Sequence, residues 1–217
     1  MARPIHADAE VTRQRILDAA ARLFGDHGLE PVTMQRIATE AGVSTAAIHH
    51  YFGSKAQLFV SCNEAYLAEL GELRAHLVQS LTEAPSLEQA VDRGIRAAWA
   101  FTRARRSMVR LMIRIVLDTG ETHPEERRQA LGPILDQGVG LLAPLLGRPP
   151  AQLRLDLIAV TYLMTRFLLN SPAEQALIVG GSEADPAGVE RAVEDHLARA
   201  GALLLGVTPL HTGGDDR

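Results

Sequence analysis

The sequence predicts an all-α protein, and two observations support this class. Apolar residues recur at steps of three or four along most of the chain, which is the spacing of one face of a helix. Alternation of apolar and polar residues is not the dominant pattern, so strands are not expected. A chain of 217 residues with 47% hydrophobic content can bury the core of one or two compact domains.

The N-terminal helices share a polar cap at their start or a glycine that ends them. Thr33, Ser44 and Ser54 are the predicted N-caps, and Gly28 and Gly42 are the predicted stops. The helices are expected over about residues 8–26, 34–41 and 45–51, and from residue 55 to the residue before Pro85.

The remainder of the chain is also expected to be helical. Gly132-Pro133 and Pro144 predict a kink or a break within the third of the later helices. These helices are expected over residues 86–103, 107–117, 124–146, 151–170 and 186–205. The sequence therefore predicts an N-terminal three-helix domain over 1–54, a C-terminal helical domain over 55–208 and a disordered tail over 209–217.

Composition excludes several classes of protein. The single cysteine, Cys62, cannot form an internal disulfide, and a small buried side chain is its more common role than a redox sensor. Residues 1–10 are too polar for a signal peptide, and the most apolar stretch, 153–169, contains three charged residues, which argues against a membrane span. A cytoplasmic protein is expected.

Charge alone does not predict a nucleic-acid partner. The net charge is −4, and the six basic and six acidic residues among the first sixty cancel. Phosphate binding usually needs clustered lysine and arginine. Any DNA-binding role must therefore depend on where side chains lie.

The segment 33–53 predicts two short helices joined by a tight turn at Ala41-Gly42-Val43-Ser44. Gly42 suits a turn that leaves a helix in the left-handed conformation, and Val43 is expected to fill the corner between the helices. This pattern predicts a helix-turn-helix whose second helix projects from the surface. The residues expected to pack the pair against the first helix are Ile37, Ala38, Ile48 and Phe52, opposite Leu23 and Phe24.

The outward side chains of the projecting helix are expected to be Thr45, Ala46, His49 and His50. They are small enough for the backbone to approach a major groove, and Thr45 can contact a thymine methyl group or a base edge. Thr33 and Lys55 lie at helix N-termini, which favour a phosphate. A metal site at His49 and His50 is not expected, because neighbouring helical residues point about 100° apart.

From residue 16 to residue 59 the chain resembles the TetR family of bacterial regulators. The resemblance implies a homodimer with one DNA-reading domain per subunit and a C-terminal helical domain that binds a small effector, which in most members releases DNA. It implies phosphate contacts for Thr33, Tyr51 and Lys55, and base contacts for Thr45 and Ala46. The matching residues are Ile16, Ala20, Phe24, Gly28, Thr33, Ile37, Ala38, Ala41-Gly42-Val43-Ser44, Ile48, Tyr51-Phe52, Ser54-Lys55 and Leu58. The full set of candidate DNA-binding residues is Thr33, Arg36, Ser44, Thr45, Ala46, His49, His50, Tyr51 and Lys55.

Two residues depart from the family pattern. His49 stands where the family usually has a tyrosine, and Ala46 where it often has a glycine. A histidine can still hydrogen-bond a phosphate, but it adds a pH dependence that a phenol lacks.

The C-terminal region holds candidates for an effector site. Trp99 and its neighbours lie where the family places an effector cavity, although plain core packing explains each residue taken singly. Five arginines between Arg103 and Arg114 predict a solvated face or, alternatively, a docking strip for an anionic ligand. The candidate ligand-binding residues are Trp99, Arg103, Met108, Met112, Tyr162 and Phe167.

Two of the later helices are expected to mediate dimerisation. The helix over 151–170 is apolar on more than one face. Together with the last helix it predicts a four-helix interface across a two-fold axis, to which the last helix would contribute Val189, Val193, Leu197, Ala200 and Leu204. The alternative is that both helices only complete the monomer core.

The function that these features predict is a DNA-binding repressor released from a pseudo-palindromic operator by a small-molecule effector. The alternative is a constitutive DNA-binding or adaptor protein without a ligand. An enzyme is not expected, because the sequence holds no nucleophile elbow, no phosphate-cradling glycine loop and no Cys/His ligand set, and no cofactor or metal is expected.

Overall fold

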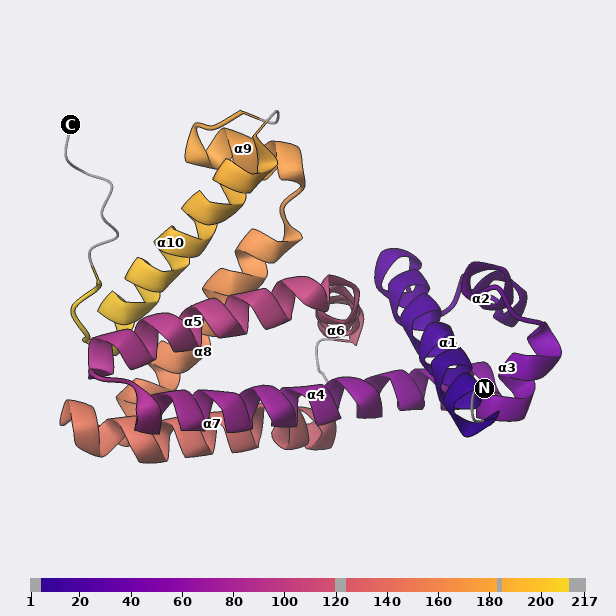
Figure 1. Ribbon diagram of the computed structural model, residues 1–217, viewed down its shortest axis with the longest axis horizontal. Coiled ribbons are helices and arrows are strands. Elements are labelled where there is room, and N and C mark those ends of the chain that lie inside the picture. Colours follow the sequence, from indigo (N-terminus) through magenta and orange to yellow (C-terminus); the bar gives the residue numbers. More distant parts are fainter. Residues whose placement is uncertain (1–4, 120–123, 183–184, 211–217) are drawn as a thin grey trace. The chain divides into compact units, whose positions relative to one another are not determined.

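The all-α prediction is confirmed by the computed structural model of the chain (Figure 1). The structure describes residues 5–119, 124–182 and 185–210, and within these residues every regular element is a helix. The helices are α1 (Ile5–His27), α2 (Met34–Ala41), α3 (Thr45–Phe52), α4 (Lys55–Glu83), α5 (Leu87–Ala104), α6 (Arg106–Thr119), α7 (Pro124–Leu146), α8 (Pro150–Leu169), α9 (Pro172–Val179) and α10 (Pro186–Leu205).

The chain forms two compact units, and their limits differ from the domain boundary predicted at residue 54. Unit 1 comprises residues 1–70 and 105–126, and unit 2 comprises residues 71–104 and 127–217. Unit 1 extends beyond α3 because the first half of α4 contributes to its core and because α6 packs along α1. Most of the predicted tail, residues 211–217, lies outside the described residues.

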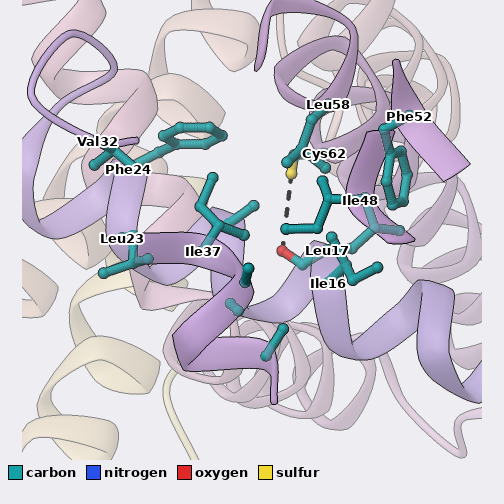
Figure 2. Close-up of a cluster of buried hydrophobic side chains, with 14 of the residues drawn as sticks. Ile16, Leu17, Leu23, Phe24, Val32, Ile37, Ile48, Phe52, Leu58 and Cys62 are labelled. Carbon is teal, nitrogen blue, oxygen red and sulfur yellow. Dashed lines mark hydrogen bonds between the residues drawn. The ribbon is translucent and has the colours of Figure 1, made fainter. Parts of the chain in front are cut away.

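Unit 1 is built around one hydrophobic core that the helix-turn-helix shares with α1, α4 and α6 (Figure 2). The residues predicted to pack α2 and α3 against α1 are all buried in this core: Leu23, Phe24, Ile37, Ala38, Ile48 and Phe52. Val43 packs against the same core from the turn, as predicted. The short helices α2 and α3 are therefore held by tertiary packing, since helices of eight residues are marginal by themselves.

Close helix contact fixes α6 on α1. A Cβ atom added at Gly25 would collide with the backbone of Ser107, so the two helices can approach this closely only because residue 25 has no side chain. Arg110 adds an ion pair to Asp26 at 3.1 Å.

Unit 2 is built on α5, α8 and α10, which pack against one another. Val189, Val193 and Leu197, which were expected at a dimer interface, are buried within this unit. For these three residues the monomer core is therefore the correct assignment, whereas Ala200 is half-buried and Leu204 is 37% exposed. No helix in the described part of the chain is long and apolar enough to cross a membrane.

Two elements differ from the sequence prediction. The helix α9 was missed, although Ser171 and Glu174 form a capping box around Pro172 that marks its start. For residues 124–146 the sequence predicted a kink or a break, and the break does not occur: α7 is continuous through Pro133 and Pro144.

Cys62 is a buried core residue, as expected. Its Sγ donates to the backbone carbonyl of Leu17 at 3.8 Å, and burial, with a smaller contribution from the nearby carboxylate of Asp18, raises the pKa of the thiol to about 12 (Figure 2). The thiolate fraction falls about tenfold for each pKa unit, and the thiolate is the reactive form.

We expect iodoacetamide at pH 8 to alkylate Cys62 at least about 100-fold more slowly in the native protein than in urea, because the native thiol stays protonated and enclosed. Mass spectrometry at timed intervals measures both rates. Equal rates would show that unit 1 opens freely.

The raised pKa of Cys62 also affects stability. Above pH 9.0 the thiol of the unfolded chain loses its proton before the native thiol does, so unit 1 loses stability as the pH rises towards about 12.

Candidate nucleic-acid interface

The turn between α2 and α3 is fixed by caps on both sides. Thr33 Oγ1 accepts from the backbone N–H of Arg36 at 3.2 Å, and Ser44 Oγ accepts from the backbone N–H of Ala47 at 3.1 Å. Gly42 has φ 65° and ψ 40°, the left-handed conformation that the sequence predicted. The N–H of Val43 then donates to the carbonyl of Ala38 at 3.0 Å, which closes the end of α2.

Arg15, which is not part of the sequence motif, also stabilises this turn. Its guanidinium donates to the carbonyl oxygens of Ala41 and Gly42, so α1 holds the last turn of α2. The partner carbonyls belong to the predicted turn, but they lie 26 and 27 residues from Arg15 in the sequence, so the contact gives no local sequence signal.

One face of α3 is exposed and carries short side chains. Ala46, His49 and His50 are exposed and Thr45 is half-buried, whereas Ile48 and Phe52 face the core. The structure therefore brings the four predicted outward residues to one short surface at the start and middle of α3. A surface with side chains this short lets a helix backbone approach base edges.

His49 is held by its own helix end. Its Nδ1 donates to the carbonyl of Gly53 at 2.6 Å, because a carbonyl oxygen can only accept. The neutral ring can then only accept a hydrogen bond at Nε2, whereas the imidazolium donates there. A phosphate contact by His49 would therefore require the protonated ring.

His50 and Tyr51 lie edge to face, with their ring centroids 5.4 Å apart. His50 is exposed, while the half-buried Tyr51 packs against the core of unit 1. The core of unit 1 therefore holds the aromatic ring of Tyr51, and the phenol hydroxyl remains the polar end of the side chain.

The two predicted cations are both engaged within unit 1. Lys55 Nζ donates to the carbonyl oxygens of Leu29 at 3.0 Å and Glu30 at 3.1 Å, which uses two of its three donors. Arg36 Nη2 donates to Nε2 of His27 at 2.6 Å. Each side chain is held in place and keeps further N–H groups for a phosphate.

The helix α4 begins with a capping box. Ser54 Oγ accepts from the N–H of Gln57 at 3.2 Å, and Gln57 Oε1 accepts from the N–H of Ser54 at 2.9 Å. The start of α4 is thereby fixed next to the end of α3, where Gly53 has φ 73°.

The candidate ligand residues are not all brought together. Trp99, Arg103 and Phe167 belong to unit 2, but Met108 and Met112 pack in or against the core of unit 1, because α6 lies on α1. Tyr162 is 58% exposed on α8 and does not line the interior with Trp99.

The arginines between 103 and 114 are mostly used for internal pairing. Arg103 pairs with Glu190, Arg105 with Glu69 and Arg110 with Asp26, and Arg114 donates to the backbone carbonyl of Asp26 at 3.3 Å. The prediction of a merely solvated face is therefore incomplete, and the pairing gives no support to an anion-docking strip.

The described residues thus form a helix-turn-helix on a three-helix scaffold, together with a second helical unit. Residues 16–62 match the family model described as "Bacterial regulatory proteins, tetR family". Among curated proteins, the chain is similar to the "HTH-type transcriptional regulator BetI" of Rhizobium meliloti (strain 1021), with 42% identity over 89 residues, which are 41% of this chain and 42% of that protein. The protein of the same name from Agrobacterium fabrum is 49% identical over 72 residues, which are 33% of this chain and 34% of that protein.

The likeness to solved structures covers nearly the whole chain. The regulator PfmR from Thermus thermophilus has a TM-score of 0.61 at 23% identity and covers 93% of this chain and 98% of its own. The fatty acid degradation regulator FadR from Bacillus halodurans has a TM-score of 0.58 at 16% identity, with 95% and 97% covered. At these identities the likeness shows the shared fold.

The comparisons therefore show a match to the tetR family model over residues 16–62 and, over nearly the whole chain, a shared fold. The matched segment spans less than half the length of the two curated relatives.

Proposed function

We propose that the protein is a homodimeric transcriptional repressor of the cytoplasm, which binds a pseudo-palindromic operator and is released from it by a small-molecule effector. The observation that carries the proposal is the exposed face of α3, where Thr45, Ala46 and His49 lie beside capped helix ends. Such a face fits a major groove, and the N-termini of α2 and α4 supply N–H groups for the flanking phosphates.

The remaining candidate residues have complementary roles in this proposal. Thr33 and Lys55 would hold phosphates at the starts of α2 and α4, with Arg36 and Tyr51 beside them. Ser44 serves as the cap that orients α3, since its hydroxyl already accepts from Ala47. His50 extends the exposed face towards the end of the helix.

A selection from random DNA duplexes with the purified full chain tests this function. Enrichment of an inverted repeat, with half-site centres about one helical turn or somewhat more apart, is the expected result. Recovery of no sequence above the starting pool would refute DNA reading, and enrichment of a single asymmetric site would refute the symmetric dimer.

The surface proposed for dimerisation lies on α8. Leu155, Tyr162 and Leu169 are exposed and recur every seven residues, which places them on one face of the helix. The opposite face is buried through Leu153, Val160, Met164 and Leu168. Leu203 adds an exposed apolar side chain on α10. Apolar side chains arranged in this way favour a second copy of the same surface.

We expect Leu155→Asp to raise the dissociation constant of the dimer at least about tenfold, because a carboxylate would be buried without a partner in the interface. Sedimentation velocity over a range of concentrations measures this change. The matched control is Val60→Asp, which adds the same charge at an exposed position of α4. A dimer unchanged by L155D, or weakened equally by V60D, would contradict the assignment of α8.

Unit 2 is the proposed effector-binding part. It contains the buried Trp99 and, within the same unit, the proposed dimer surface, so a ligand there would act on the element that joins two subunits. A coupling of about 1–3 kcal/mol would change the affinity for DNA about five- to 150-fold. A protein whose DNA affinity no metabolite changes would instead fit the constitutive alternative.

A further inference from the structure

Trp99 is the single tryptophan of the chain and is held on α5 in unit 2. Its side chain is only 2% exposed, and its Nε1 has no hydrogen-bond partner among the described residues. Buried N–H groups are rarely left in this state, because an unmade hydrogen bond costs the full desolvation of the donor. The indole is therefore a buried donor that lacks its acceptor.

The neighbouring helices enclose this indole. Ile95 lies one turn before Trp99 on the same face of α5, and its Cδ1 is 2.6 Å from the point where a Cβ of Gly201 would lie. Val160 of α8 lies 3.5 Å from the same point. Helix α5 packs on α8 and α10 (Figure 1). The contacts of Ile95 therefore make the face of α5 that carries Ile95 and Trp99 its inner face.

The adjacent part of α10 presents apolar side chains inward. Two ion pairs bracket Trp99 along the antiparallel helices: Arg96 with Glu194 at 3.2 Å, and Arg103 with Glu190. Val193 lies between these two acids in the sequence, and Leu197 follows Glu194 by three residues. Each of the two side chains is 1% exposed. These two inward side chains carry no polar atom that could accept from the indole.

We propose that Trp99 Nε1 donates to a neutral carbonyl oxygen of a small apolar effector, an inference that rests on the effector-released function proposed above. An indole nitrogen can only donate, so the group that meets it must be an acceptor. The apolar enclosure selects an apolar body around that acceptor.

The surrounding charges favour a neutral acceptor over a carboxylate. Arg96 already contacts Asp92 at 3.0 Å, Glu194 at 3.2 Å and Asp195 at 2.8 Å. Arg103 is likewise paired with Glu190. The two cations that flank Trp99 on α5 are thus neutralised by α5 and α10, and a carboxylate ligand would add a further anion beside these acids.

The test uses the only tryptophan as its own reporter. The full-length dimer is titrated with methyl ketones from methyl butyl to methyl decyl ketone, and with the carboxylates from hexanoate to dodecanoate. Ultraviolet resonance Raman spectra follow the hydrogen bond of the indole N–H, and thermal unfolding follows binding. In the free protein the indole is expected to give the spectrum of a non-bonded N–H.

At least one ketone is expected to move the indole band to its hydrogen-bonded position and to raise the unfolding temperature, with the matching carboxylate at least about tenfold weaker. In Trp99→Phe, which keeps a buried aromatic ring without the N–H, ketone affinity is expected to fall about tenfold or more. Circular dichroism and the unfolding temperature of the free variant establish whether it is folded. The spectra of the wild-type protein test the hydrogen bond even if the variant does not fold.

Three results would overturn the inference: an indole already hydrogen-bonded in the free protein, carboxylates that bind as well as ketones, or no ketone that changes the indole band. The selected operator duplex separates this inference from the proposed function. A protein that binds the duplex but fails the ketone test refutes only the role of Trp99, whereas a protein that binds no duplex refutes the repressor.

Discussion

Phe24→Ala is expected to lower the free energy of unfolding of unit 1 by about 3–5 kcal/mol, which is a large part of the stability of a typical domain. Phe24 is fully buried in the core that joins α1 to the helix-turn-helix, and its ring meets that of Phe59 edge to face, with centroids 6.1 Å apart. Removal of the ring leaves a cavity between the helices that position α3. Loss of DNA binding is expected to accompany the loss of stability.

Urea denaturation, followed by hydrogen exchange of unit 1 amides, measures this cost. Val11→Ala on the same helix is the matched control, because Val11 is 48% exposed and its truncation is expected to change stability by less than about 0.5 kcal/mol. A Phe24→Ala protein as stable as this control would show that the shared core does not stabilise the helix-turn-helix.

Local signals in the sequence were sufficient for the helix-turn-helix. Thr33, Gly42 and Ser44 act within three or four residues of the backbone groups that they cap, so the bounds of α2 were predicted as the structure has them. The eight-residue helix α9 carries an equally local signal in its capping box, and attention to Ser171 and Glu174 would have predicted it.

Contacts between distant residues could not be predicted from the sequence. Arg110 and Asp26 are 84 residues apart, and nothing local marks them as partners. The family resemblance grouped Met112 with Trp99 as a candidate ligand residue, and no local signal in the sequence shows that Met112 packs against the core of unit 1.

The exposed face of α3 could be predicted from the sequence, because it depends on local helical phase. The hydrogen bonds of the neighbouring cations could not, because they depend on contacts between distant residues. Helical phase alone places Ala46 and His49 outward once Ile48 and Phe52 are assigned to the core. The hydrogen bonds of Lys55 to Leu29 and Glu30, and of Arg15 to Ala41, depend on how α1 approaches the other helices. That no described residue accepts a hydrogen bond from the Trp99 indole is likewise apparent only when the surrounding helices are in place.

Ala46→Glu is expected to abolish DNA binding, because it places a negative charge on the exposed face of α3 that is proposed to read DNA. Ala46 is exposed and is the second residue of α3, where a glutamate is compatible with the helix because its charge lies near the N-terminal end of the dipole. In a groove, however, the same carboxylate would face phosphates and base edges without a counter-charge. Folding should be retained while DNA binding is lost.

The measurement is the affinity of Ala46→Glu for the selected operator duplex by fluorescence anisotropy, beside Ala68→Glu, which adds the same charge at an exposed position of α4 in unit 1. We expect Ala46→Glu to bind about 100-fold or more weakly than the unchanged protein, and Ala68→Glu to bind within about threefold of it at the same salt concentration. Equal affinities for the two variants would contradict the assignment of α3 as the reading helix.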